Sequence, residues 1–158
     1  MSTAPTHPPL DLDPTPATPI VLGTMAWGSV PPPPPDADPG AGPEGPAGAA
    51  QAEAAVERAR RALRAGIEAG VDLLDTADIY GAGRSEETVG RLLHELPYEE
   101  RSALKVQTKC GIVLHETDPA GRRLTRYDSS PEHVRASLEG SLARLGEQRV
   151  DTLIIHRP

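Results

Sequence analysis

Two kinds of hydrophobic spacing alternate along the chain. Three segments carry apolar residues at every third or fourth position, the period of a helix: residues 52–67, 85–96 and 130–145. Short apolar runs of strand length lie before and between them and after the last: residues 20–22, 71–75, 104–109 and 150–156. The pattern therefore predicts the order β-α-β-α-β-α-β, which requires a parallel sheet with right-handed crossovers.

Cap and stop residues mark the ends of the predicted helices. Ser130 and Pro131 suit the cap and the first position of the last helix, and Gly146 suits its end. Ser85 is the expected cap of the middle helix, and Gly70 is the expected end of the first. The apolar stripe predicted for the last helix comprises Val134, Leu138, Leu142 and Leu145.

Two architectures share this order of elements, an open doubly wound sheet and a (β/α)8 barrel. A doubly wound dinucleotide-binding domain carries a glycine fingerprint between a strand and a helix. The candidate in this sequence, GAGRSE at 81–86, has Glu86 in place of the third glycine. Glu86 and Glu87 also place negative charge at a helix N-terminus, where a pyrophosphate would have to lie. The sequence therefore favours the barrel.

The length of the chain limits how much of a barrel it supplies. A complete barrel of this kind takes about 250 residues, and the chain has 158. We therefore predict an α/β fold of the (β/α)8 TIM-barrel type with only the first half present, about four strands and three helices.

Proline and glycine divide the chain into segments. Fourteen of the 18 prolines lie in the first 50 residues, five of them consecutively at 31–35, and such stretches form neither helices nor strand ladders. We predict a flexible Pro-rich tail at 1–18 and a partial barrel at 19–158, with a Pro/Gly-rich inserted loop at about 30–50. The segment 111–128, after the third strand, is expected to be a long loop.

Charge and composition exclude several classes of protein. The net charge is −7 and no run of Lys or Arg occurs, so we expect no nucleic-acid partner. The single cysteine, Cys110, allows no internal disulfide, and the scattered histidines offer no clustered ligands, so we predict no metal. No apolar run approaches the roughly 18 residues of a membrane helix. The first 14 residues lack the features of a secretory signal, and we expect a cytoplasmic protein with no membrane partner.

Three polar residues end three different predicted strands: Asp75, Lys109 and His156. In a barrel these strand ends face one mouth, where active sites are built. Alternation along the third strand would point Gln107 and Lys109 inward and Thr108 toward the helices. A lysine facing inward requires a partner, and Asp75 on the adjacent strand is available. Each residue alone is compatible with a structural role, and their meeting at one rim is what favours catalysis.

Tyr80, five residues after Asp75, adds a group that can transfer a proton. A free tyrosine has a pKa of about 10 and is a poor acid at neutral pH, but a cation within a few ångströms stabilises the tyrosinate. A histidine opposite could hold a carbonyl oxygen by a hydrogen bond. Such a set would protonate an oxygen that gains negative charge, as a carbonyl does when it accepts hydride. Asp78 is expected to be a solvated turn acid, and Gly81 and Gly83 to shape a turn without holding phosphate.

Four stretches resemble successive strand ends of the aldo-keto reductase family, in the order of that family: LGTMAWG, LLDTADIYG, VQTKCGI and VDTLIIHRP. The five-residue step from Asp75 to Tyr80 is also that of the family. The resemblance covers roughly residues 19–29 and 52–158. It implies a (β/α)8 barrel that uses NADPH to reduce aldehydes and ketones to alcohols.

The resemblance also implies a role for each matching residue. Tyr80 would donate the proton, Lys109 would activate it, Asp75 would pair with Lys109, and His156 would orient a small-molecule carbonyl substrate. The implied cofactor contacts are Thr24, Met25 and Asp75. The implied substrate-pocket residues are Trp27, Tyr80 and His156.

The chain departs from the family pattern after its fourth strand. Members of the family take most of their cofactor contacts from later strands, so we expect this chain alone to lack a complete cofactor site and to be a truncated or fragmentary member. His156 is expected to be poorly fixed because it lies near the end of the sequence. Exposed strand edges of a half-barrel favour self-association. The alternative hypothesis is a catalytically inactive half-barrel that acts as a binding or regulatory module.

Overall fold

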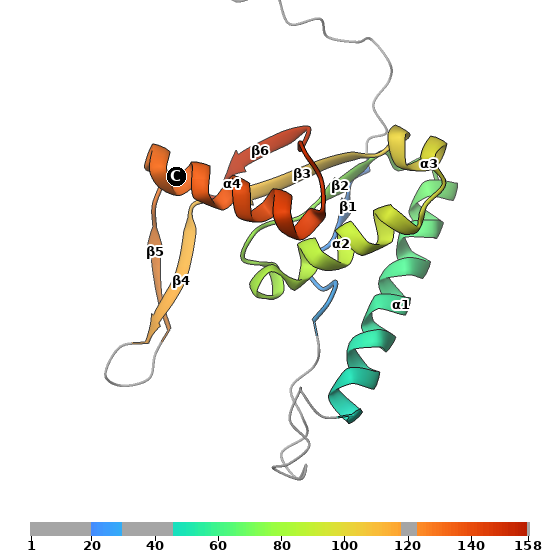
Figure 1. The fold of residues 1–158 in the computed structure, drawn as a ribbon, viewed down its shortest axis with the longest axis horizontal. Coiled ribbons are helices and arrows are strands. Elements are labelled where there is room, and N and C mark those ends of the chain that lie inside the picture. The colour runs from blue at the N-terminus through green and yellow to red at the C-terminus, as the bar shows by residue number, and fades with distance from the viewer. Residues whose placement is uncertain (1–19, 30–45, 118–122, 158) are drawn as a thin grey trace, which may run out of the picture.

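The computed structural model describes residues 20–29, 46–117 and 123–157. In these ranges four parallel strands form one sheet in the order β1-β2-β3-β6 (Figure 1). The strands are β1 (Leu22–Gly23), β2 (Leu73–Asp75), β3 (Lys105–Cys110) and β6 (Thr152–Ile155). The predicted tail at 1–18 and most of the predicted loop at 30–50 lie outside the described residues.

The longer helices in the crossovers between neighbouring strands are α1 (Pro46–Glu68), α2 (Arg84–Glu95) and α4 (Pro131–Leu145). β1 pairs with β2, β2 with β3 and β3 with β6, each pair in parallel. This repeated strand–helix unit confirms the predicted α/β barrel half. Among the described ranges, none of the helices has the length and apolarity that crossing a membrane requires.

The hydrophobic core lies between the sheet and the helices. Every layer contributes buried side chains to one cluster: Val56, Ala59 and Leu63 of α1, Leu74 of β2, Val89, Leu92 and Leu93 of α2, Val106 of β3, and Leu145 of α4. Trp27, which follows β1, joins this cluster. Of the stripe predicted for α4, only Leu145 is fully buried, and its other three members are half-buried.

The predicted ends of the last and first helices are confirmed. Ser130 caps α4, and its side chain accepts the N–H of His133 at 3.3 Å. Pro131 is the first residue of this helix, and Gly146 ends it in the left-handed conformation with φ of 66°. Gly70 has φ of 82° and lies just after α1. Each of these residues acts through its own backbone or side chain, so no distant contact is needed to predict it.

The prediction that Ser85 caps α2 is wrong. A short 3-10 turn, η1 (Tyr80–Gly83), leads directly into α2, and Gly83 occupies the cap position with φ of 92°. Ser85 is completely buried inside the helix, where its hydroxyl donates to the carbonyl oxygen of Thr24 at 2.7 Å. The hydroxyl therefore ties α2 to the end of β1, a long-range contact that overrides its local capping preference.

Several elements and boundaries differ from the predictions. The segment expected to be a long loop forms a hairpin of β4 (Ile112–Thr117) and β5 (Arg123–Tyr127), which extends away from the four-stranded sheet (Figure 1). The six-residue helix α3 (Tyr98–Ala103) was not predicted, because it buries no residue and so shows no apolar stripe. α1 begins six residues before the predicted start at residue 52, in an alanine-rich stretch that favours helix without periodicity.

A buried carboxylate joins α2 to β3 and α4. Glu86 is fully buried; one of its oxygens accepts the Thr108 hydroxyl at 2.6 Å and the other accepts Arg144 Nε at 2.7 Å. Thr108 thus points toward the helices, as alternation along β3 predicts. A buried charge with both oxygens satisfied stabilises one arrangement of the three elements, because any shift leaves it unpaired.

Gly90, in α2, lies directly against the backbone of α4. A Cβ at this position would lie 2.5 Å from the carbonyl oxygen of Leu145, whereas a Cβ at Gly140 would meet only the flexible end of Arg144, at 3.1 Å. We expect Gly90→Ala to destabilise the protein by about 1–3 kcal/mol, because backbone cannot yield as a side chain can. Gly140→Ala is the matched control and should be neutral or stabilising by up to about 1 kcal/mol through helix propensity. Thermal unfolding of both variants checks this; equal melting temperatures would contradict it.

Candidate active site

Lys109, on β3, holds its ammonium group between three acceptors. Its Nζ lies 2.8 Å from Asp75 Oδ2, 2.8 Å from the carbonyl oxygen of Thr76 and 3.1 Å from the hydroxyl oxygen of Tyr80. An ammonium group has three N–H donors, so these contacts use all of them. Only 13% of the Lys109 side chain is exposed, and a cation so placed requires such partners. The predicted pairing of Lys109 with Asp75 is therefore present.

Asp75 ends β2 and has a partner on each carboxylate oxygen. Oδ2 accepts from Lys109, and Oδ1 accepts from the amide nitrogen of Gln107 at 2.7 Å. Gln107 is the residue opposite Asp75 in the β2–β3 register. Gln107 and Lys109 thus share the face of β3 that alternation assigned to the barrel interior.

Tyr80 approaches the ammonium group from the start of η1. Because its hydroxyl oxygen accepts from Lys109, its own hydrogen is left for another acceptor. The Lys109 Nζ also lies 4.7 Å from the centroid of the Tyr80 ring. The two residues after Tyr80, Gly81 and Ala82, adopt left-handed φ values of 59° and 57°. For Ala82 this conformation costs about 1 kcal/mol, so the turn that sets the tyrosine is held by its surroundings.

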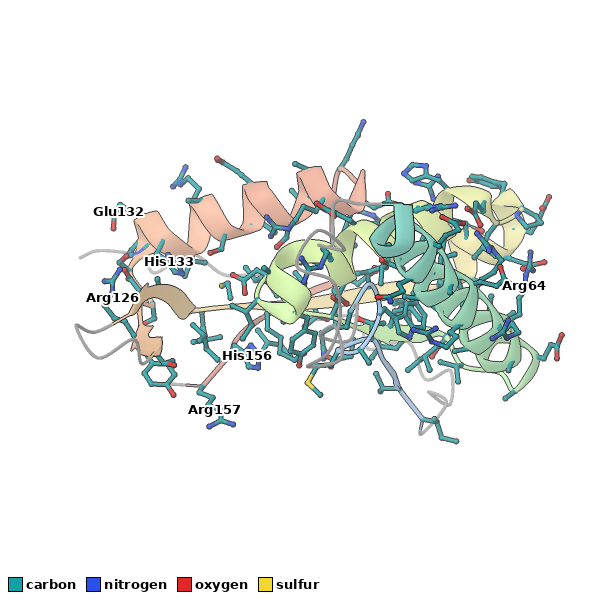
Figure 2. All side chains as sticks on the ribbon, turned by 90° about the horizontal axis from the view of Figure 1, so that it is seen from below. Arg64, Arg126, Glu132, His133, His156 and Arg157 are labelled. Atoms are coloured by element: carbon teal, nitrogen blue, oxygen red, sulfur yellow. The ribbon has the colours of Figure 1, made fainter. Side chains whose placement is uncertain are left out.

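His156 follows β6 and faces the tyrosine edge-on. The ring centroids of Tyr80 and His156 are 5.7 Å apart, with an angle of 84° between the planes. Figure 2 shows His156 and Arg157 well apart from Arg64 of α1, which lies toward the far end of the molecule. Against the expectation of a poorly fixed residue, the His156 backbone N–H donates to the carbonyl oxygen of Cys110 at 2.7 Å.

The electrostatics around His156 favour a neutral ring. Burial lowers the pKa of His156, and the cations Lys109 and Arg157 lower it further, while Asp75 opposes them. Its Nδ1 is buried and has no hydrogen-bond partner among the described residues. The ring can therefore direct a hydrogen bond to a neutral or partly negative oxygen without carrying a full charge.

Three other predicted site residues have different surroundings. Thr24 is fully buried, and both its N–H and its hydroxyl donate to the carbonyl oxygen of Asp75, at 2.9 and 3.0 Å. Met25 is 66% exposed next to it. Trp27 is 8% exposed and belongs to the core cluster. The expected roles of Thr24 and Met25 at a cofactor, and of Trp27 at a substrate, remain predictions.

The expectation that Asp78 is a solvated turn acid is wrong. It lines a cavity of about 390 Å³ between η1, β4 and α4, together with His133, Ser137 and Arg144. Its Oδ1 is buried without a partner among the described residues. Burial and the neighbouring Glu86 carboxylate raise the pKa of Asp78, while Ser137 and Arg144 oppose this. The buried surroundings of Asp78 cannot be predicted from local pattern, because the groups that line its cavity come from distant segments.

Four polar side chains at the carboxyl ends of parallel strands form the kind of site found at the mouth of a barrel enzyme. Comparison with known proteins identifies the family to which this partial barrel belongs. A model of the Aldo/keto reductase family matches residues 19–158. The chain belongs to the aldo/keto reductase family, whose curated members similar to it include oxidoreductases.

Three curated relatives illustrate the range of the family. The 6-dehydroglucose reductase of Agrobacterium fabrum is 39% identical over 100 residues, 61% of this chain and 32% of the relative. The NADH-specific methylglyoxal reductase of Escherichia coli is 38% identical over 91 residues, 55% of this chain and 27% of the relative. A protein of Oryza sativa subsp. japonica named "Probable voltage-gated potassium channel subunit beta" is 35% identical over 103 residues, 65% of this chain and 29% of the relative.

Solved structures agree with the family assignment. The glycerol dehydrogenase of Gluconobacter oxydans superposes with a TM-score of 0.57 at 30% identity, covering 85% of this chain and 34% of that protein. The chain thus spans about a third of the length of the relatives it matches.

The lowered pKa of His156 leads to a test of the electrostatics of the site. Replacing Lys109 by Met removes a cation near the ring and leaves Asp75 without its ammonium partner, so we expect the pKa of His156 to rise. Titration of the histidine ring protons by NMR measures this, with the His156 signal assigned from a His156→Gln variant. Lys105→Met is the control, since that side chain is 62% exposed and paired with Asp72. An unchanged or lower pKa in Lys109→Met would contradict the described geometry.

The raised pKa of Asp78 predicts that neutralising this side chain stabilises the fold by an amount that depends on pH. A carboxyl group whose pKa is higher in the folded state weakens folding increasingly as the pH rises from its unfolded-state pKa to its folded-state pKa, and by a constant amount above that. We therefore expect Asp78→Asn to melt at a higher temperature than wild type at neutral pH. The difference should vanish as the pH falls to the ordinary aspartate pKa of about 3.9, where the wild-type group is protonated.

Thermal unfolding over this pH range measures the effect of Asp78→Asn. Asp72→Asn is the matched control, because Asp72 pairs with the exposed Lys105 at 3.9 Å and such pairs contribute little. A melting temperature of Asp78→Asn below wild type at neutral pH would overturn the interpretation that the Asp78 charge weakens folding.

Proposed function

We propose that the protein is an NADPH-dependent reductase of small-molecule aldehydes or ketones, in which Tyr80 donates the proton. The observation that carries this proposal is the saturated ammonium group of Lys109, whose third donor bonds the Tyr80 hydroxyl oxygen. A cation held at that oxygen stabilises the tyrosinate that remains after proton transfer. Because the hydroxyl oxygen accepts from Lys109, the phenolic hydrogen is left for a substrate oxygen.

The residues of this chain supply the proton half of the reaction. When bound, a reduced nicotinamide supplies a hydride to the carbonyl carbon. Tyr80 gives its proton to the carbonyl oxygen, so that hydride and proton together make an alcohol. Lys109 stabilises the resulting tyrosinate, and Asp75 keeps the ammonium group in place. His156, opposite the Tyr80 ring, donates a hydrogen bond to the carbonyl oxygen and orients it.

The described residues fit the reactive end of such a cofactor. Lys109 is bonded to both Asp75 and Tyr80, and the His156 ring, whose pKa is lowered, lies across from Tyr80. We propose that Thr24, Met25 and Asp75 border the cofactor. Because one relative is named as NADH-specific, activity should be compared with both NADPH and NADH.

A second candidate is a binding or regulatory module without catalysis. It draws on the relative named as a potassium channel subunit beta and on the two edges of the described four-stranded sheet, β1 and β6. Strand edges pair readily with other chains, so self-association is part of this candidate. Light scattering of the purified chain addresses it: a stable, monodisperse and inert complex favours the module, and carbonyl reduction favours the enzyme.

Tyr80→Phe tests the proton donor. We expect it to lower the rate of aldehyde-dependent NADPH oxidation by about 100-fold to 10,000-fold, because the ring stays and the hydroxyl that would give the proton is lost. The protein should be expressed with any coding sequence that continues in frame after Pro158. Tyr98→Phe is the matched control, since Tyr98 is 80% exposed, and it should retain full activity. Retained activity in Tyr80→Phe would exclude Tyr80 as the proton donor.

A further inference from the structure

We propose that Gln107 is a positioning residue for the reaction, acting on Tyr80 through Asp75 and Lys109. The inference rests on the proposed function. Gln107 directs its side-chain amide at Asp75 Oδ1, the oxygen that Lys109 leaves free, at 2.7 Å. It faces the mouth from the same side of β3 as Lys109 and contacts none of the atoms that would react.

Both carboxylate oxygens of Asp75 must be held if the carboxylate is to keep one orientation. The terminal torsion of an aspartate side chain is broad and has little preference of its own. With Lys109 alone, the carboxylate could rotate about that bond and take the ammonium group with it. The amide of Gln107 fixes the second oxygen, so the Lys109 Nζ faces Tyr80 at a constant distance.

The backbone of Gln107 supports a second acceptor of Lys109. The carbonyl oxygen of Gln107 accepts the N–H of Thr76 at 2.9 Å, and the carbonyl oxygen of Thr76 accepts from Lys109 at 2.8 Å. Two of the three acceptors of the ammonium group therefore rest on one residue. Any residue at position 107 could accept the Thr76 N–H through its backbone. Only a side chain of this length with an N–H donor also reaches Asp75 Oδ1.

The neutrality of the amide also matters for the role. A cationic side chain in place of Gln107 would compete with Lys109 for Asp75, and a carboxylate would repel Asp75. The neutral amide of Gln107 holds the Asp75 carboxylate without adding a charge to the Asp75–Lys109 ion pair. Lys109 then remains the sole cation beside the Tyr80 hydroxyl among the described residues.

The sequence offers a direct way to observe the ammonium group, because Lys105 and Lys109 are its only two lysines. Both lie on β3, at opposite ends. Lys105 is 62% exposed, whereas Lys109 is 13% exposed and fully hydrogen-bonded. The rate of acetylation of each amine by a water-soluble N-hydroxysuccinimide ester, followed by mass spectrometry, reports how firmly Lys109 is held. Lys105 serves as the internal control for the strand.

We expect Gln107→Met to raise the acetylation rate of Lys109 about fivefold or more. The variant loses the charge-assisted hydrogen bond that holds Asp75, the ion-pair partner of Lys109. Lys105 should react at the wild-type rate. Gln107→Asn, which shortens the side chain by one methylene and withdraws the amide, should also raise the acetylation rate of Lys109. Gln51→Met, the same substitution at an exposed position of α1, should leave the acetylation rates of both lysines unchanged. Equal acceleration of both lysines, or of neither, overturns the proposal.

The kinetic arm separates positioning from general damage. In the active protein, Gln107→Met should lower kcat by about tenfold with little change in the KM of the carbonyl substrate, because Gln107 orders the proton donor and does not touch substrate. A raised KM with unchanged kcat overturns the proposal. The acetylation arm needs neither cofactor nor substrate, so a failure of the proposed function, seen as full activity in Tyr80→Phe, is distinguishable from a failure of the role of Gln107.

Discussion

The ammonium group of Lys109 is the constraint on which the rest of the site depends. Because the Lys109 ammonium group has little exposure to water, its three N–H groups must donate to acceptors of the protein. Its acceptors come from the end of β2, from the residue after it and from the start of η1. The site therefore exists only when β2 and β3 are paired in their native register, which places Asp75 opposite Gln107. Sheet formation and assembly of the candidate chemistry are one event.

A second network, on the opposite face of the same strand, sets the position of the tyrosine. Glu86 takes hydrogen bonds from Thr108 and Arg144, and its neighbour Ser85 bonds the end of β1. Together they fix the first turn of α2, and η1 with Tyr80 leads directly into that turn. The main-chain N–H of Asp78 also donates to the carbonyl oxygen of Lys109 at 3.1 Å. The strained turn around Tyr80 is thus held by buried bonds at both ends.

The fold and the four strand-end residues could be predicted because their signals are local or periodic. Helical spacing and the caps around Ser130 depend on neighbours in sequence, and the alternation of β3 fixes which side chains share a face. The hairpin of β4 and β5 carries no clear alternation, so its sequence pattern predicts a loop. The buried surroundings of Asp78, the role of Ser85 inside α2 and the bond from Gln107 to Asp75 depend on segments far apart in sequence.

The alternation of β3 has a consequence for how this chain can vary over evolutionary time. One face of the strand carries Gln107 and Lys109, which bond Asp75, and the other carries Thr108, which bonds Glu86, so adjacent positions belong to different faces. A substitution on one face removes the contacts of that face and leaves the other face in place. Insertion or deletion of a single residue within the strand would exchange the two faces and place lysine against the helix core and threonine at the mouth. A change in the length of β3 therefore disrupts both networks at once, whereas a substitution disrupts one.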